Sequence, residues 1–485
     1  MEARTIAVAP GSTQSATTYI SRIEDVISTH YAAAHLPQEP FARESWQELC
    51  NMGIMRSMLP RAFGGSDDHE ELCRLIEAIA RHNLPLSMYT MIITTLFIRN
   101  VVKYGTEALK QEVLPLFGTR ALIGGFALTE PGCGSNLARM TTVYEATETG
   151  YHITGPKHWQ AFSATADWWL VAAKNKHNDQ EFGFFIVRRD EGFTNVALYN
   201  ALGLKAIDYG LNEIDAVVPA YRRLMVTAPR LDGAVDMLCA SRLSMSAMAS
   251  GFTSRIAEEA NERAQSRAIG NGKLAQLGFV QHKLGQLAAN HTITKALLGF
   301  VIRQTDFRND LTAHFFEAQA VKTLSTDKML ESALLYQQLC GGEGYRHHAP
   351  GNTAAAALLD ARVYTVFDGT NDLLSQQLAE YCQQKAGDKD VVTFLSQFDK
   401  TAKGMQHLSF DVSVLNLREC HAQKVLNGQI IARIFGLHCL EESMWAEGPE
   451  KTAYPDVKRA IAFLVADIKK IMAEAEIVQA AGTVA

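Results

Sequence analysis

The spacing of apolar residues changes along the chain and predicts where helices and strands lie. Between about Tyr19 and Phe117, apolar positions recur every three or four residues, which predicts helices. From about residue 121 to Leu224, short β-branched and aromatic runs alternate with Gly, Asn and Asp, which predicts strands and turns. From Leu231 the helical spacing returns and continues to the end. The predicted order is therefore α, β, α and α, with a polar connector at 383–392 before the last helical part.

The last predicted helix carries one continuous apolar seam. Its apolar residues follow each other at alternating spacings of four and three: Val457, Ile461, Leu464, Ile468, Ile471, Ala475 and Val478. This spacing places them on one face over about three heptads. We expect the seam to pack in a core, and a contact between two copies of the chain is the alternative.

Composition narrows the class of protein. The chain has 485 residues, of which 47% are hydrophobic and 20% charged, as in ordinary globular proteins. A net charge of -6 offers no basic field for a nucleic acid, and no apolar run reaches the roughly 18 residues of a membrane span. The eight cysteines are scattered without a Cys-x-x-Cys pair, so we expect neither a metal site nor disulfides. With no secretory signal at the start, a cytoplasmic location is expected.

Four segments combine residues that could carry chemistry. In 126–136, Gly132, Gly134 and Ser135 could bind an anion through backbone N–H groups, although such a turn is more often only a turn. In 155–169, Trp159 could be a core residue or one wall of a slot for a flat ring.

The other two segments lie in the second helical part. The Gly-rich stretch 338–345 is typical of a helix C-cap. In 359–374, Asp368 and Gly369 form a common turn dipeptide, but the Asp could equally be a base placed where an element ends.

Taken together, these segments resemble the acyl-CoA dehydrogenase flavoproteins in order and spacing, over roughly residues 20 to 385. The family's four motifs are matched by Phe126, Thr129, Glu130, Pro131, Gly134 and Ser135; by Gly155, Lys157 and Trp159; by Gln338, Gly341, Gly342, Gly344 and Tyr345; and by Asp360, Ala361, Asp368, Gly369 and Thr370.

This resemblance implies a mainly helical fold around a central β-barrel. The implied parts are an N-terminal helical domain (1–122), the β-barrel domain (123–230), a four-helix bundle (231–386) and an additional C-terminal helical domain (387–485). The last part is similar in placement to that of the very-long-chain members. The resemblance also implies FAD between barrel and bundle, and a homodimer or homotetramer in which a neighbouring subunit completes the FAD site.

The resemblance assigns roles to individual residues. Those implied to bind FAD are Phe126, Leu128, Thr129, Gly134, Ser135, Trp159, Ala161, Arg267, Gln281, Gln338, Gly342 and Thr370. Those implied to contact substrate are Ser135, Arg242 and Gly369. Asp368 is implied to be the catalytic base, which removes the α-proton of an acyl thioester while the β-hydrogen leaves as hydride to flavin N5.

Asp368 stands where most family members carry Glu, so the carboxylate is one methylene shorter. A misplacement of about 1 Å can cost on the order of 100-fold in rate, which predicts a reshaped pocket or a different carbon acid. Some members place the base just before a bundle Arg; here that Arg is Arg242 and its predecessor is Ser241, which has no carboxylate.

Several positions depart from the family pattern. The usual Trp-Ile-Thr is Trp159-Gln160-Ala161, and Gln281 arrives later than the family's glutamine. Cys239 replaces an acidic residue that many members place near CoA. The loop after Tyr345 is longer than usual, and we expect its His347 and His348 to be exposed rather than catalytic.

The leading hypothesis is an FAD-dependent dehydrogenase that converts an acyl thioester to the trans-2-enoyl thioester. Its substrate would be carried by CoA or by an acyl carrier protein, and an electron-transfer flavoprotein or similar protein would accept the electrons. A nitroalkane-oxidase-like flavin oxidase is the alternative, because those relatives carry Asp within F-D-G-G-N and this chain reads F-D-G-T-N. A binding or assembly module that has lost catalysis is the third hypothesis.

Overall fold

The protein is described by a computed structural model that covers residues 16–32, 41–134, 136–226, 232–347, 349–417, 420–446 and 454–482. By its internal contacts the chain divides into two units. The first comprises residues 1–237 and 307–310, and the second comprises 238–306 and 311–485. The limits of the four smaller domains, 1–122, 123–230, 231–386 and 387–485, stay a prediction. Each unit is described by itself.

The first unit begins with helices, as the apolar spacing predicted. They are α1 (Ala16–His30), α2 (Arg43–Asn51), α3 (His69–His82), α4 (Leu84–Met91), a π-helical turn (Ile92–Ile98), α5 (Arg99–Tyr104) and α6 (Glu107–Thr119). Asp68 and Thr106 cap α3 and α6 by accepting hydrogen bonds from backbone N–H groups of the first turn.

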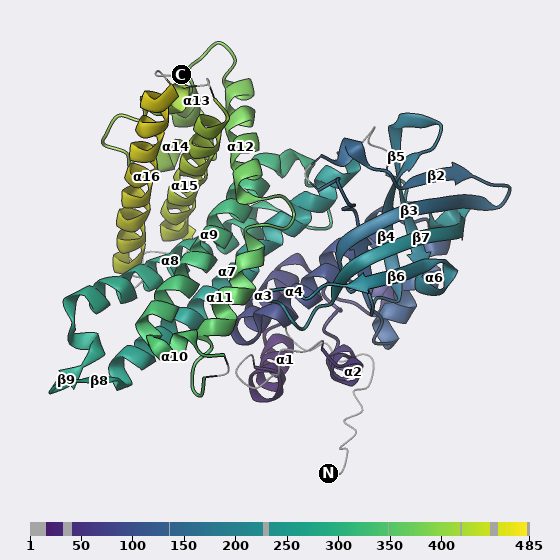
Figure 1. Ribbon diagram of the computed structural model, residues 1–485, viewed down its shortest axis with the longest axis horizontal. Helices are drawn as coiled ribbons and strands as arrows, with labels where there is room; N and C mark the ends of the chain where they lie inside the picture. The colour runs from purple at the N-terminus through teal and green to yellow at the C-terminus, as the bar shows by residue number, and fades with distance from the viewer. Residues whose placement is uncertain are drawn as a thin grey trace. The chain divides into compact units, whose positions relative to one another are not determined.

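A seven-stranded sheet follows these helices in the first unit (Figure 1). Its strands are β1 (Gly124–Ala127), β2 (Val143–Ala146), β3 (Gly150–Ala161), β4 (Trp168–Asn175), β5 (Asn178–Arg188), β6 (Phe193–Leu198) and β7 (Tyr209–Pro219). The order is β1-β4-β2-β3-β7-β6, with β5 paired to β4, and β1–β4 and β2–β4 are parallel pairs. The sheet is curled into a half-barrel. The predicted mainly helical fold with a central β-domain is confirmed.

The second unit is helical. Its helices are α7 (Asp232–Ser266, from Leu238 onward), α8 (Gly278–Gln304), α9 (Phe315–Cys340), α10 (Gly342–Tyr345), α11 (Ala354–Tyr364), α12 (Asn371–Ala386), α13 (Val391–Gln397), α14 (Ala402–Met405), α15 (His421–Ala446) and α16 (Tyr454–Gly482), with a short hairpin of β8 (Ala268–Ile269) and β9 (Gly272–Lys273). Helix α9 packs against α8, α11 and α12. Thr253 of α7 is hydrogen-bonded to Thr294 of α8 at 2.8 Å.

The apolar seam of the last helix packs inside the second unit. Val457, Leu464, Ile468, Ile471 and Ala475 are buried, and α16 packs against α15 and α8 (Figure 1). The prediction of a packed core seam is therefore confirmed for these positions.

One helical stretch, Leu84–Tyr104, is long and apolar enough to cross a membrane by length and composition alone. Within the described residues, 89% of its apolar window is buried in the protein. This is the burial expected of a core helix in a globular protein.

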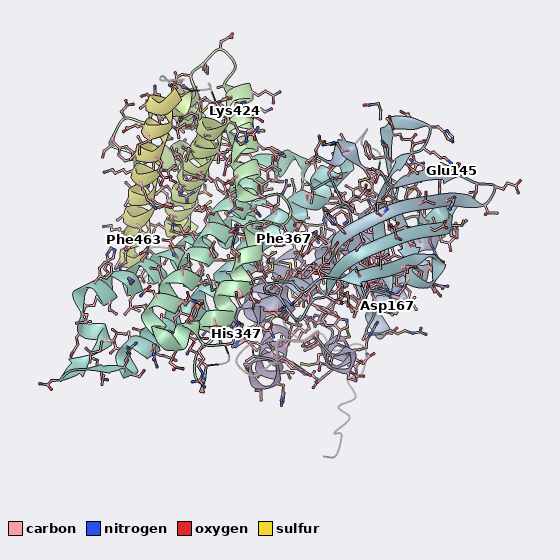
Figure 2. All side chains as sticks on the ribbon, viewed as in Figure 1. Glu145, Asp167, His347, Phe367, Lys424 and Phe463 are labelled. Carbon is pink, nitrogen blue, oxygen red and sulfur yellow. The ribbon has the colours of Figure 1, made fainter. Side chains whose placement is uncertain are left out.

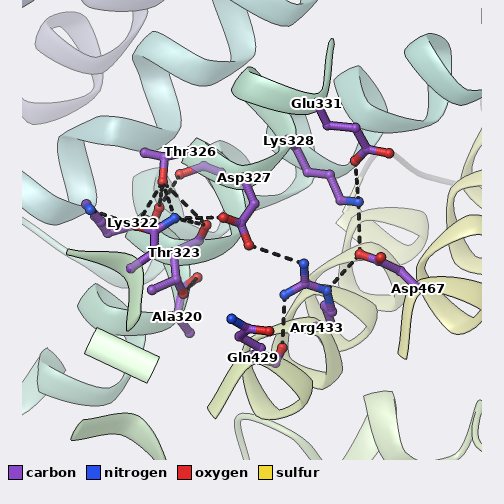
Figure 3. A network of polar contacts seen from close by, with 12 residues as sticks. Ala320, Lys322, Thr323, Thr326, Asp327, Lys328, Glu331, Gln429, Arg433 and Asp467 are labelled. Atoms are coloured by element: carbon purple, nitrogen blue, oxygen red, sulfur yellow. Dashed lines mark hydrogen bonds and ion pairs between the residues drawn. The ribbon is translucent and has the colours of Figure 1, made fainter. Parts of the chain in front are cut away.

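Three helices of the second unit are joined by a cluster of buried charges. Arg433 of α15 donates to Asp467 of α16 at 2.7 Å, and Lys328 of α9 donates to the same carboxylate at 3.0 Å (Figure 3). Only 8% of the Arg433 side chain and 5% of the Lys328 side chain are exposed. Burial opposes ionisation of Asp467, but the two cations outweigh it and lower its pKa from 3.8 to about 2.

We expect Asp467→Asn to lower the free energy of unfolding by about 2 kcal/mol near neutral pH, because a depressed pKa in the folded state stabilises the ionised protein. This stabilisation is present above pH 4, roughly, and is lost as the pH falls toward 2. Urea unfolding at several pH values measures it. Asp456→Asn, which changes an exposed carboxylate of the same helix, is the control and should have little effect. An unchanged unfolding free energy in Asp467→Asn would contradict this account.

Candidate functional site

Asp368 lies in the turn between α11 and α12, and the turn has an unusual backbone. Asp368 has a φ of 56° and Gly369 a φ of 96°, both in the left-handed region. A Cβ on Gly369 would lie 2.9 Å from a methyl carbon of Leu374, so only glycine fits there. Thr370 then caps α12 by accepting a hydrogen bond from the N–H of Leu373 at 3.3 Å. The sequence motif therefore fixes where the Asp368 side chain leaves the backbone.

Two neighbouring residues of α7 hold Asp368. The Ser241 hydroxyl donates a hydrogen bond to the Asp368 carboxylate. Arg242 donates from Nε and Nη2 to the Asp368 carbonyl oxygen, at 3.0 and 2.8 Å. Surrounding protein atoms desolvate the carboxylate and raise its pKa, which Ser241 and the nearby cations only partly offset. A raised pKa makes the ionised carboxylate a stronger base.

Lys322 of α9 holds the next residues of the turn. Its side chain is fully buried, and its Nζ donates to the Gly369 carbonyl oxygen at 2.8 Å and to Oδ1 of Asn371 at 2.7 Å. Burial lowers the pKa of Lys322 to about 7, with Asp368 opposing the shift. The Asp368 turn is thus held from α7 and from α9.

In the first unit, a buried ion pair holds the loop after β1. Lys157 of β3 donates to Glu130 at 2.8 Å and to the Leu128 carbonyl oxygen at 3.1 Å, and neither charged side chain is exposed. Glu130 also accepts from the backbone N–H groups of Thr141 and Thr142. These donors outweigh desolvation and lower the pKa of Glu130, so the carboxylate stays ionised.

The Trp159 side chain lies on the surface of the first unit. The β3–β7 register shifts between His158 and Gln160, and Trp159 at the shift has a φ of 59°. Its side chain is 53% exposed and rests on Tyr199, with ring centroids 4.6 Å apart. The core alternative is therefore wrong for Trp159, because the bulge turns its indole outward.

The departures at 160 and 161 have a structural explanation. Gln160 is buried, and its amide nitrogen donates to the carbonyl oxygens of Thr129 at 2.9 Å and His158 at 2.6 Å. Asn212 donates to its amide oxygen at 3.1 Å. Gln160 therefore ties the 126–130 loop to β3, while Ala161 itself supplies no hydroxyl.

In the second unit, Arg267 directly after α7 lies beside Gly341 directly after α9. Gly341 has a φ of 63°, and a Cβ there would lie 3.2 Å from Nη1 of Arg267. The buried Nε of Arg263, one turn earlier in α7, has no hydrogen-bond partner among the described residues. Gln338 and Gly342 flank this glycine turn and are exposed. Arg263 and Arg267 are four residues apart at the C-terminal end of α7, so two positive charges lie at this end of the helix.

The remaining predicted residues lie as follows. Phe126, Thr129 and Ala161 are half-buried, Leu128 is buried, and Gly134 and Thr370 are exposed. Gln281 is exposed in the first turn of α8. His347 is exposed in the loop after α10, as expected (Figure 2). Ser135 and His348 lie outside the described residues. The described residues include no group of three or more His, Cys, Asp or Glu arranged for a metal ion.

Sequence reasoning missed Lys322 and Asn371, and it gave Ser241 no role. The available signal for Lys322 was its position in a run of mostly apolar and small residues. A lysine buried in such a run needs hydrogen-bond acceptors or an opposite charge. Asn371 follows the motif directly but reads as an ordinary first residue of a helix.

Comparison with known proteins identifies the family. Residues 17–119, 125–217 and 232–382 match the N-terminal, middle and C-terminal domains of acyl-CoA dehydrogenases, in that order. The chain belongs to the acyl-CoA dehydrogenase family. The predicted family is confirmed, and its enzymes are FAD-dependent dehydrogenases.

Acyl-CoA dehydrogenases of several kinds are similar to this chain. The human mitochondrial very long-chain specific enzyme is 25% identical over 375 residues, which are 74% of this chain and 56% of that protein. The chain thus spans little more than half the length of this relative. A Bacillus anthracis acyl-CoA dehydrogenase solved with FAD has a TM-score of 0.79 at 19% identity, covering 97% of this chain and 90% of that one. Megasphaera elsdenii butyryl-CoA dehydrogenase has a TM-score of 0.68 at 20% identity, covering 77% and 99%.

We expect Lys157→Met to destabilise the protein by about 3–5 kcal/mol, because it leaves Glu130 buried without its cation. Thermal and urea unfolding measure the loss. The control is Lys176→Met in the turn between β4 and β5, which removes a half-exposed partner of Glu145 and should barely move either midpoint. Equal stability of the two variants would show that the buried pair does not hold the loop.

Proposed function

We propose that the protein is an FAD-dependent dehydrogenase that converts an acyl thioester to its trans-2-enoyl thioester, with Asp368 as the base. The observation that carries this proposal is the Asp368 carboxylate itself. It sits on a left-handed turn, it accepts a hydrogen bond from Ser241, and burial raises its pKa. Family membership supports the reaction class.

The residues present fit FAD. In the second unit, an anionic pyrophosphate suits Arg267 beside Gly341 and the Nε of Arg263, which has no partner in the part of the chain that the structure describes. A larger residue at 341 would crowd Arg267. In the first unit, the outward-facing indole of Trp159 suits a flat ring. We propose that these residues hold FAD together with Phe126, Leu128, Thr129, Gly134, Ser135, Ala161, Gln281, Gln338, Gly342 and Thr370. When bound, FAD supplies the hydride acceptor.

The remaining steps belong to the chain's own residues. The ionised Asp368 carboxylate takes the α-proton of the thioester, and the electron pair of that bond forms the new double bond. The β-hydrogen leaves at the same time with its own electron pair, as hydride. Ser241 directs the carboxylate, and Arg242 fixes the backbone carbonyl behind it. We propose that Arg242, Gly369 and Ser135 contact the substrate.

The carrier of the acyl group, the acceptor and the assembly are part of the same proposal. We propose acyl-CoA as the substrate, with an acyl carrier protein as the alternative carrier, because Cys239 replaces the acidic residue that many members place near CoA. We propose an electron-transfer flavoprotein or similar acceptor, a homodimer or homotetramer, and a cytoplasmic location.

Anaerobic mixing of the purified flavoprotein with acyl-CoAs from butyryl-CoA to palmitoyl-CoA tests the reaction class. Bleaching of the oxidised-flavin band is the expected result. Oxygen consumption with nitroalkanes, without bleaching by any acyl-CoA, would instead support the oxidase. A flavin that responds to neither would support the binding-module hypothesis.

We expect Asp368→Asn to bind FAD normally but to lose acyl-CoA-dependent flavin reduction by about 100-fold or more, because an amide cannot accept the α-proton. Stopped-flow absorbance at the flavin band measures the rate, and the absorbance ratio of flavin to protein verifies cofactor content. Reduction at the wild-type rate would remove Asp368 from the mechanism.

We expect Ser241→Ala to shift the acidic limb of the pH–rate profile to higher pH. The Ser241 hydroxyl stabilises the ionised carboxylate, so its loss raises the pKa of Asp368 further, and the base is then protonated at pH values where the wild type is active. Ser246→Ala is the matched control, because the Ser246 hydroxyl on the same helix donates to the Leu243 carbonyl oxygen instead. An acidic limb that stays in place, or moves to lower pH, would contradict the assignment.

A further inference from the structure

A continuous line of polar contacts leaves the Asp368 turn toward the C-terminal helices. Lys322 binds the Gly369 carbonyl oxygen and Oδ1 of Asn371. The other side of the Asn371 amide donates from Nδ2 to Oδ1 of Asp327 at 2.7 Å and to the Thr326 hydroxyl at 3.0 Å. Asn371 thereby links the first turn of α12 to two residues of α9 and to the lysine that holds the base turn.

The line continues into α15 and α16 through one arginine (Figure 3). Arg433 donates from Nη2 to Oδ2 of Asp327 at 3.2 Å and from Nε to Asp467 at 2.7 Å. Asp467 also accepts from Lys328, which returns the line to α9. Asp327 therefore has Asn371 on one carboxylate oxygen and Arg433 on the other.

We propose that the C-terminal helices hold the catalytic turn in place, and that Arg433, Asp327, Asn371 and Lys322 are positioning residues for Asp368. This inference rests on the proposed role of Asp368 as base. It gives α15 and α16, two helices of the additional C-terminal part, a role within their own subunit besides packing, which is to hold the Asp368 turn.

Lys322 is fully buried, so its charge depends on the two acceptors that it contacts. Asn371 can present Oδ1 to Lys322 only while its Nδ2 points to Asp327. The Asp327 side chain is 29% exposed, and Arg433 is the cation that holds its outer oxygen. Without Arg433, Asp327 is free to turn toward water. Asn371 then loses the charged acceptor of its Nδ2 and keeps the neutral ones, the Thr326 hydroxyl at 3.0 Å and the Thr323 carbonyl oxygen at 3.3 Å. The amide is held less firmly, and Lys322 loses the fixed orientation of its own acceptor.

The charged groups around this line determine in which direction the pKa of Asp368 shifts when the line is broken. Arg242 and Lys322 are the cations that face Asp368. Lys322 in turn faces Asp368, Arg242, Asp327 and Asp372. Both cations favour the ionised carboxylate. Displacement of Lys322 therefore disfavours ionisation of Asp368 and shifts the acidic limb of the pH–rate profile to higher pH.

The test compares Arg433→Met with Lys424→Met in the full-length flavoprotein. Lys424 lies on the same helix (Figure 2), where it forms an ion pair with Glu380 of α12 at 3.0 Å that is not part of the line. Arg433→Lys keeps a cation at the same place and should restore part of any loss. Asp327→Asn removes the charge that Arg433 binds while keeping the shape, so it tests the link if Arg433→Met fails to fold.

Two readouts are measured on each variant. The first is the rate of flavin reduction by butyryl-, octanoyl- or palmitoyl-CoA against pH. In Arg433→Met we expect a fall of at least about 5-fold with little change in apparent KM, and an acidic limb at higher pH. The second is hydrogen exchange of backbone amides in 365–374, which should be about 10-fold faster. Lys424→Met should match the wild type in both.

Wild-type exchange in 365–374 together with a wild-type pH profile in Arg433→Met and in Asp327→Asn would overturn the inference. Equal changes in Lys424→Met would overturn it as well, because they would reflect general loosening of α15. Failure of the proposed function is a separate result. An Asp368→Asn variant that reduces its flavin normally would reject Asp368 as base, while the exchange data would still decide whether Arg433 holds the turn.

Discussion

The Asp368 carboxylate is desolvated by the surrounding protein and is contacted there by groups that favour its ionised form. Burial alone would drive Asp368 to its neutral form, and cations alone would make it a poor base. The turn combines both effects, because it lies beside Arg242 and Lys322 but places the Ser241 hydroxyl on the carboxylate itself. A base whose pKa is raised, yet which still ionises, is what removal of a weakly acidic α-proton requires.

The same solution appears in each unit: a buried lysine holds the loop that follows a motif. Lys157 pairs with Glu130 and binds the Leu128 carbonyl oxygen behind β1. Lys322 binds the Gly369 carbonyl oxygen and Asn371 in the Asp368 turn. Loops that carry chemistry have few apolar contacts of their own, so directional hydrogen bonds from buried donors keep them in one conformation.

The order of helices and strands could be predicted from the sequence because apolar periodicity is local. The seam of α16 is an example: Leu464 and Ile468 were placed in a core by spacing alone, and both are buried. Motif matches likewise located the Asp368 turn. The positive φ of Trp159 was not predictable, since it results from a register shift against β7 that no local pattern marks.

Contacts between distant parts of the chain were also out of reach of sequence reasoning. Ser241 and Asp368 are 127 residues apart, and only the packing of α7 against the turn brings them together. From the sequence, Ser241 marks a position without the carboxylate that some family members place there, whereas in the structure its hydroxyl donates to the Asp368 carboxylate. The contact of Arg433 with Asp327 depends in the same way on how α15 packs on α9.

Exchange of the substrate α-hydrogen with solvent deuterium tests the central claim most directly. A 3-thiaacyl-CoA carries sulfur in place of the β-carbon, so it has no β-hydrogen to lose and reports proton removal alone. We predict that the wild-type flavoprotein incorporates deuterium at the α-carbon of this compound and that Asp368→Asn does not. NMR measures the incorporation. Equal incorporation by both proteins would contradict the assignment of Asp368 as the base.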